Sequence, residues 1–122
     1  MEDKPGSSKR QLLGRLGEET ARKYLEEKGF VFQQANFRTK NGEIDLIMLD
    51  GNQLVFIEVK TRKSSLFGHG VEAITPRKQS KIRAVAIEYL QKYKGQAGIR
   101  FDVVVLTYTG QQLDILHIPY AF

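Results

Sequence analysis

Two ionisable residues, Glu58 and Lys60, occur in a part of the sequence where core packing does not explain them. In the segment 53–60 (QLVFIEVK) both alternating faces are apolar, so the segment is expected to be an interior β-strand. Glu58 and Lys60 share one face, where ionised groups are costly unless they are paired or bind a metal. The same Glu-x-Lys pattern starts at Glu2 and Glu26, in a polar tail and at a helix end. Only Glu58 is embedded in an apolar strand.

A second carboxylate, Asp45, lies in the segment 42–50 (GEIDLIMLD), and a turn at 51–52 separates that segment from 53–60. Two apolar segments joined in this way predict a β-hairpin. With a two-residue turn at 51–52, Asp45 faces Glu58 and their Cβ atoms are about 4.5–5.5 Å apart. A turn centred one residue earlier keeps Asp45 on the face of Glu58, whereas an odd-numbered loop separates the two.

The same pairing would place Glu43 opposite Lys60, and the lysine would relieve part of the repulsion between the carboxylates. Two adjacent carboxylates are usually compensated by a shared proton or by a bridging divalent cation. The chain has no cysteine, and its two histidines, His69 and His117, are far apart in the sequence. Thiolate metal sites are therefore excluded, a histidine-rich site is not expected, and a hard cation on carboxylates is the default.

A third carboxylate, Glu18, lies in the segment 8–28, whose apolar residues follow helical spacing up to Gly29. Glu18 has small and apolar helical neighbours, whereas surface ion pairs account for Glu19. Glu18 is therefore the better candidate to face the strands. The alternative is that Glu18 only flanks the apolar stripe and pairs with Arg22.

The remaining segments predict an α/β domain with the order α-β-β-β-α-β-β. Residues 1–8 are expected to form a short disordered tail before a single domain over 9–122. Thr75 and Pro76 have the residue types of a helix N-cap and first helical position. The other expected elements are strands at 30–37, 100–107 and 112–118, a mobile loop at 61–70, and a second helix that ends near Gly95.

Composition and charge narrow the functional classes. The 122 residues carry a formal charge of +5, and the pI is about 9.5, which makes a polyanionic partner plausible beside the alternative of a merely basic protein. The first ten residues have no apolar stretch, and no segment approaches the ~18–20 apolar residues of a membrane span. A cytoplasmic protein without a membrane partner is the expectation.

Larger stretches of the sequence carry a resemblance to a known family. Asp45 in GEIDLI, twelve intervening residues and then Glu58, Val59 and Lys60 resemble the PD-(D/E)XK nuclease signature, with Ile44 in place of its proline. GEETARKYLEEKGF, GEIDLIMLD, VFIEVKTR, the helix after residue 76 and RFDVVVL resemble the YraN-like family of small bacterial proteins. The resemblance implies a restriction-endonuclease-like fold, similar to archaeal Holliday junction resolvases, with a mixed β-sheet flanked by helices.

The resemblance also implies an activity and a site. It implies a metal-dependent endonuclease that hydrolyses phosphodiester bonds in DNA rather than RNA, including branched or junction DNA, where a homodimer would let two sites cut two strands. Glu18, Asp45 and Glu58 are the implied ligands of Mg²⁺ or Mn²⁺, together with the Val59 carbonyl. Lys60 is the implied cationic partner of the attacking water. These chemical types suit phosphodiester hydrolysis, which develops negative charge at the phosphate.

Basic residues in the flanking segments are candidates for phosphate contacts, although each one alone is more simply explained as a solvated surface charge. Lys78 ranks first because it lies in the first turn of the second helix. The loop residue His69 is a substrate contact or merely exposed, His117 has no evident partner, and Asp102 is expected to cap or to pair with Arg100. The candidates for nucleic-acid binding are Arg38, Lys40, Arg62, Lys63, Arg77, Lys78 and Lys81.

Two other functional classes remain open at the level of sequence. One is a non-catalytic nucleic-acid-binding module that keeps the nuclease fold. The other is a structural or partner-binding protein in which the charged cluster only holds the strands together. Metal binding at Asp45 and Glu58 separates the nuclease from the module, and the stability of neutralised variants separates both from the structural role.

Overall fold

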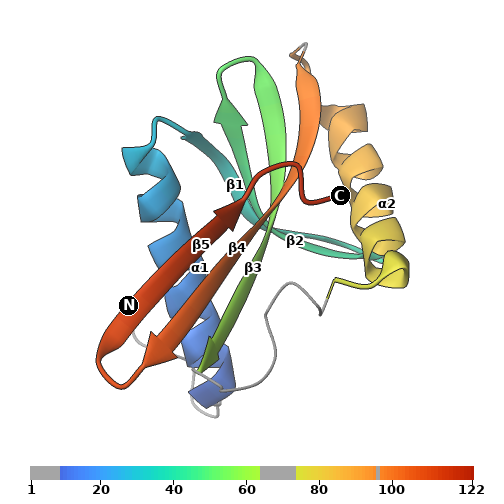
Figure 1. Ribbon diagram of the computed structural model, residues 1–122. Coiled ribbons are helices and arrows are strands. Elements are labelled where there is room, and N and C mark those ends of the chain that lie inside the picture. Colours follow the sequence, from blue (N-terminus) through green and yellow to red (C-terminus); the bar gives the residue numbers. More distant parts are fainter. Residues whose placement is uncertain (1–8, 64–73, 96) are drawn as a thin grey trace.

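The computed structural model describes residues 9–63, 74–95 and 97–122 (Figure 1). This part of the chain forms two helices and five strands, and the predicted α/β class and order α-β-β-β-α-β-β are confirmed. Neither described helix has the length and apolar character that crossing a membrane would require. The elements are α1 (Lys9–Glu27), β1 (Val31–Thr39), β2 (Gly42–Asp50), β3 (Gln53–Lys63), α2 (Pro76–Lys92), β4 (Gly98–Thr109) and β5 (Gln112–Ile118).

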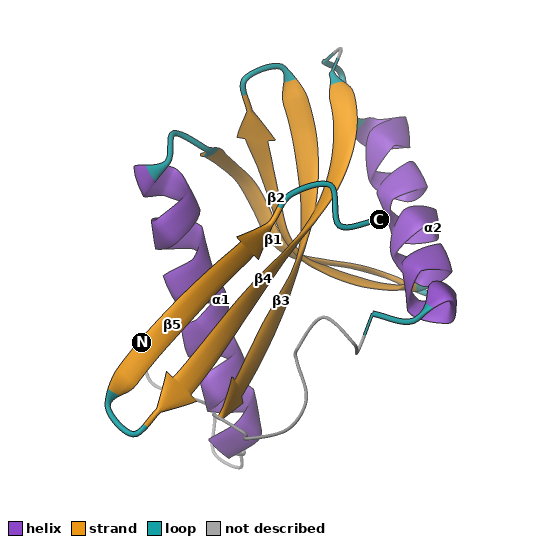
Figure 2. Cartoon of the chain, in the orientation of Figure 1, coloured by secondary structure: helices purple, strands orange, loops and turns teal. Residues whose placement is uncertain are grey.

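The five strands form one mixed sheet in the order β1-β2-β3-β4-β5. Neighbouring strands are antiparallel except β3 and β4, which are parallel. A parallel pair needs a crossover connection, and α2 lies in the segment that provides it. The two helices lie on opposite faces of the twisted sheet (Figure 2), so the central strands are buried on both sides.

Each face of the sheet has its own apolar core. Under α1, the helix residues Ala21 and Leu25 pack on side chains that alternate along the central strands. Under α2, Ile82, Val85 and Ala86 pack on the opposite set. The predicted alternation along β3 is confirmed, because Val55 and Ile57 belong to the first core and Leu54 and Phe56 to the second.

The β2–β3 hairpin has the predicted register. Asp50 pairs with Gln53, and the ladder continues to Leu46 opposite Ile57. Gly51 has a φ of 60°, the left-handed conformation that the favoured two-residue hairpin turns require. The turn at 51–52 therefore sets the parity that directs Asp45 toward Glu58.

Several element boundaries differ from the prediction, and the ends of β3 and α2 differ most. β3 continues to Lys63, because its parallel pairing with β4 extends to Lys63 opposite Tyr108. Residues 61–63 are therefore strand rather than loop, while 64–70 of the predicted loop, with His69, and the predicted tail 1–8 lie outside the described residues. The helix α2 ends at Lys92, before Gly95, and the N–H of Tyr93 donates to the Leu90 carbonyl at its C-terminus.

A buried charged network connects β4 to the end of the chain. The Asp102 side chain is 0% exposed and accepts two hydrogen bonds of 2.9 Å from Arg100, whose side chain is 6% exposed. The expected pairing of Asp102 with Arg100 is thus confirmed. His117, for which the sequence indicates no partner, lies with Nε2 2.7 Å from Asp102 Oδ2. The β4–β5 ladder pairs Val104 with His117, and this long-range register brings the histidine to Asp102.

Candidate functional site

The candidate site forms where β2 separates from β3. Counted from the turn, the last pair of the ladder between these strands is Leu46 and Ile57. The next pair would be Asp45 and Glu58. Beyond that point the Val59 N–H donates to Asp45 Oδ2 at 2.8 Å. The carboxylate therefore takes the place of a ladder acceptor, which fixes Asp45 at the edge of the gap between the strands.

Four carboxylates from three elements converge at this gap. Oxygens of Glu18, Glu43 and Asp45 lie within 4.8 Å of one another. Glu58 joins the group from β3 through a hydrogen bond and a charge interaction with Asp45. The Glu58 side chain is only 11% exposed. The structure thus brings Glu18, Asp45 and Glu58 together as predicted, and it adds Glu43.

Helix α1 reaches the strands because it carries a glycine at the contact. A Cβ atom on Gly17 would overlap the Thr61 hydroxyl of β3, so only glycine permits this approach. The next residue, Glu18, is half-buried and interacts with Asn36 and Asp45. The alternative of a pair with Arg22 is not what the structure contains, since Arg22 Nε lies 3.3 Å from Glu26 Oε2.

The electrostatics of the cluster favour a proton or a cation. Burial, together with the hydrogen bond and charge of Glu58, raises the pKa of Asp45 from 3.8 to about 9. Burial also raises the pKa of Glu18, and the charges of Glu43 and Glu58 act in the same direction. The cluster therefore favours a shared proton or a bound positive ion over four separate negative charges.

Two lysines border the carboxylates on the α2 side of the sheet. Lys78 Nζ lies 3.6 Å from Glu58 Oε2, and Lys60 is half-buried on the same strand face as Glu58. Burial and the neighbouring Lys78 lower the pKa of Lys60. Lys78 owes its place to the start of α2, where the Thr75 hydroxyl accepts a hydrogen bond from the Lys78 N–H and Pro76 occupies the first turn.

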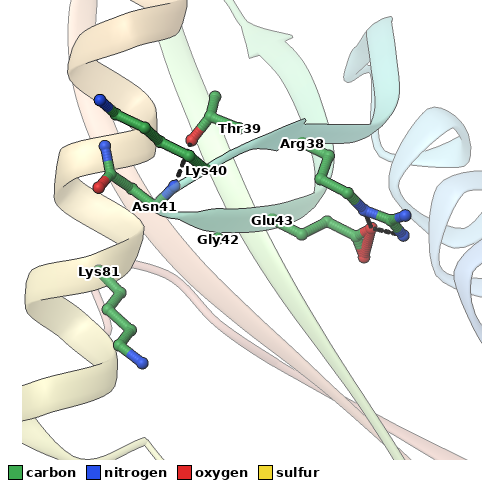
Figure 3. Close-up of a pocket in the computed structure, with 7 residues that line it drawn as sticks. All are labelled: Arg38, Thr39, Lys40, Asn41, Gly42, Glu43 and Lys81. Atoms are coloured by element: carbon green, nitrogen blue, oxygen red, sulfur yellow. Dashed lines mark hydrogen bonds and ion pairs between the residues drawn. The ribbon is translucent and has the colours of Figure 1, made fainter.

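The predicted nucleic-acid contacts fall into separate places. Lys40 and Lys81 line a groove of about 440 Å³ between the β1–β2 turn and α2 (Figure 3). Arg38 lines the same groove, with its guanidinium 2.6 Å from Glu43 Oε2. A second groove of about 520 Å³ is lined by Thr75, Arg77, Lys78 and Lys81. The two grooves share Lys81, so they form a neighbouring pair beside the cluster.

The other two basic candidates lie further along β3. Arg62 is half-buried and shares the strand face of Glu58 and Lys60 by alternation. Lys63 is exposed and lines a depression with Tyr108, Thr109 and Gly110 at the β4–β5 turn. Lys63 is thus placed with the β4–β5 turn and apart from the two grooves at α2.

The predicted position of Glu43 opposite Lys60 is wrong. β2 pairs with β3 only from Leu46 onward. Glu43 lies before this paired part and pairs instead with Arg38 across the β1–β2 ladder. This separation turns Glu43 toward Glu18 and Asp45. Its spacing of two residues from Asp45 is a signal that sequence reasoning could have used, because residues i and i+2 share one face of a strand.

The fold and this site define an α/β protein in which a helix and two separating strands hold a carboxylate cluster bordered by lysines. The model described as "Uncharacterised protein family UPF0102" matches residues 17–106. The chain belongs to this family, which confirms the expected YraN-like membership.

Three similar proteins illustrate how much of the chain the family likeness covers. A UPF0102 protein of Pelotomaculum thermopropionicum is 43% identical over 93% of this chain and 97% of its own length. One of Geobacter metallireducens is 43% identical over 90% of this chain and 91% of its own length. One of Herminiimonas arsenicoxydans is 42% identical over 82% of this chain and 81% of its own length. The likeness therefore includes both helices and the strands that carry the cluster.

Proposed function

We propose that this protein is a Mg²⁺- or Mn²⁺-dependent endonuclease that hydrolyses phosphodiester bonds in DNA. The observation that carries the proposal is the half-buried Asp45, which lies among three other carboxylates and has a pKa raised to about 9. A structural ion pair would place a cation against such a group. The lysines instead lie toward Glu58, at the border of the cluster.

The donor set fits a hard divalent cation. Each converging group is a carboxylate, and Mg²⁺ and Mn²⁺ prefer oxygen ligands. Glu18, Asp45 and Glu58 would hold the ion, and Glu43 is positioned to assist them. The Val59 carbonyl points toward the same gap as the Val59 N–H, which donates to Asp45, because both groups of a strand residue point to one side.

Each residue then has a role in hydrolysis. When bound, the metal ion supplies an activated water and neutralises the nonbridging phosphate oxygens. The Lys60 ammonium, on the face of Glu58, orients the attacking water and stabilises the negative charge that develops at the phosphate. Lys78 keeps Glu58 in place through the contact of 3.6 Å. The four carboxylates also repel the negative phosphate of a substrate. Binding of a phosphate next to them therefore requires the cation.

The basic grooves support DNA as the partner. Lys40, Lys78 and Lys81 offer ammonium groups beside the cluster, and phosphate contacts of this kind supply sequence-independent affinity. The formal charge of +5 acts in the same direction. Preference for DNA over RNA, cleavage of branched DNA and assembly as a homodimer stay predictions that follow from the resemblance. A cytoplasmic location stays a prediction from the absence of long apolar segments in the sequence.

A cleavage assay tests the proposal. Purified protein is incubated with duplex, single-stranded and four-way-junction DNA and with RNA, in Mg²⁺, Mn²⁺ or EDTA. We expect metal-dependent cleavage of DNA that falls by about 100-fold or more in Lys60→Ala and Asp45→Asn. Lys23→Ala is the matched control, because Lys23 is an exposed lysine on α1, and it should cleave like the wild type.

The second candidate function is a nucleic-acid-binding module without turnover. It is favoured by the position of Lys40 and Lys81, which line a groove of their own. Of the four carboxylates in the cluster, only Glu43 lines this groove. Metal-independent binding in EDTA, with no cleavage of any substrate in Mg²⁺ or Mn²⁺, would replace the nuclease proposal with this module.

A further inference from the structure

Asn36 has a backbone conformation that a strand residue rarely adopts. Its φ is 54°, although it lies within β1, and among the described non-glycine residues only Tyr120 shares a positive φ. Asparagine tolerates the left-handed region better than most residues, but the conformation still costs on the order of 1 kcal/mol. Such strain persists where the surrounding structure requires it.

The strained residue lies beside the carboxylate cluster. In the β1–β2 ladder, Ala35 pairs with Leu46 and Phe37 pairs with Ile44, which leaves Asn36 facing Asp45. Asn36 also lines a pocket of about 230 Å³ between α1 and β1, and Glu18 lines the same pocket. The conformation of Asn36 and the position of the cluster are thus parts of one local arrangement.

The Asn36 side chain interacts with a carboxylate of the cluster. Hydrogen-bond interactions with Asn36 and with Asp45 both act to lower the pKa of Glu18, against the effect of burial. A carboxylate accepts, so the amide of Asn36 is the group suited to donate to Glu18. A series of interactions therefore connects the strained residue through Glu18 to Asp45.

We propose that Asn36 is a positioning residue whose amide orients the Glu18 carboxylate toward Asp45 for metal binding. This inference rests on the proposed function, because it assigns Asn36 a task at the same site. Hydrogen bonds from outer residues orient metal ligands, and their removal typically weakens metal affinity by about 10–100-fold. Asn36 does not itself need to touch the ion.

The requirement for both a left-handed backbone and an amide donor explains the residue type. Glycine would adopt the conformation without strain but has no amide to donate. Alanine would supply neither feature, and aspartate would place another negative charge beside Glu18. Asparagine alone combines a short side-chain donor with tolerance of positive φ.

The test compares two asparagines on the same hairpin. Asn36→Gly removes the amide that interacts with Glu18 and keeps the backbone conformation accessible. Asn41→Gly is the matched control, because the Asn41 amide also donates to a glutamate, Glu88 Oε2 at 3.1 Å, outside the cluster. Binding of Mn²⁺ is measured by isothermal titration calorimetry, and the free energy of unfolding by urea denaturation without metal.

We expect Asn36→Gly to weaken Mn²⁺ binding by about tenfold and Asn41→Gly to leave the Kd unchanged. The double variant Asn36→Gly/Glu18→Gln should bind Mn²⁺ no more weakly than Glu18→Gln alone, because Asn36 acts through Glu18. A role confined to hairpin stability would change the unfolding free energy and leave the wild-type Kd intact.

The outcomes separate this inference from the proposed function. If wild-type protein binds Mn²⁺ and Asn36→Gly binds it equally well, the role of Asn36 is wrong and the metal site stands. Additive losses in the double variant would also overturn the role, since they would show that Asn36 acts independently of Glu18. If wild-type protein binds no Mn²⁺, the proposed function fails and the inference fails with it.

Discussion

Two aspartates on the same sheet, the buried Asp102 and the half-buried Asp45, have opposite surroundings. Asp102 on β4 receives hydrogen bonds from Arg100, from the Tyr120 N–H and from His117. Asp45 on β2 receives one backbone hydrogen bond, from Val59, and is otherwise surrounded by Glu18, Glu43 and Glu58. Asp102 is thus surrounded by hydrogen-bond donors, and Asp45 mainly by further acceptors.

The difference appears in the protonation of the two groups. Burial alone would raise the pKa of Asp102, but the hydrogen bonds from His117 and Arg100 lower it. Burial and the neighbouring carboxylates raise the pKa of Asp45 to about 9. A network that satisfies its own charges stabilises the fold, whereas a carboxylate whose nearest partners are other carboxylates is better suited to bind a cation. We therefore assign a structural role to Asp102 and a functional role to Asp45.

The largest expected effect is on Asp102. Asp102→Asn should lower the free energy of unfolding by about 3 kcal/mol, because the buried Arg100 guanidinium loses one of its two carboxylate partners and keeps only Asp50. Asp45→Asn should not lower it, since neutralising one of several clustered carboxylates relieves repulsion. Urea denaturation of both variants at pH 7 without metal measures the contrast. Equal losses in the two variants would show that the Asp45 cluster is also structural.

The sequence predicts the central pair of the site because local rules determine it. The turn at 51–52 sets the hairpin parity, and that parity brings Asp45 to Glu58. Glu43 is misplaced because the separation of β2 from β3 depends on Asp45 replacing a ladder acceptor, which no spacing rule encodes. The contact of His117 with Asp102 was missed because it depends on the β4–β5 register rather than on neighbouring residues.

A medium effect is expected where α1 meets β3. Gly17→Ala should lower the unfolding free energy by about 1–3 kcal/mol, because the added methyl overlaps Thr61. The displaced helix should also withdraw Glu18 and weaken Mn²⁺ binding in calorimetry. Gly14→Ala is the matched control, since a Cβ there meets nothing within 4 Å, and it should be neutral or stabilising by up to about 1 kcal/mol. Unaltered Mn²⁺ affinity in Gly17→Ala would remove α1 from the site.

The last expected effect is a pH dependence of opposite sign at the two aspartates. Asp45 binds its proton more tightly in the folded state, so its contribution to stability is present below pH 4 and is lost as the pH rises toward 9. Asp102 has a lowered pKa, so its contribution is present above pH 4 and is lost as the pH falls further.

Comparison of Asp45→Asn with the wild type isolates the first of these contributions. The two proteins should have similar unfolding free energies near pH 4, and the variant should become the more stable one as the pH rises toward 8, because its side chain has no proton to lose. Urea denaturation at several pH values measures this difference. A difference that stays constant from pH 4 to pH 8 would mean that Asp45 is ionised in the folded protein, so that no proton would need to leave before a metal ion binds.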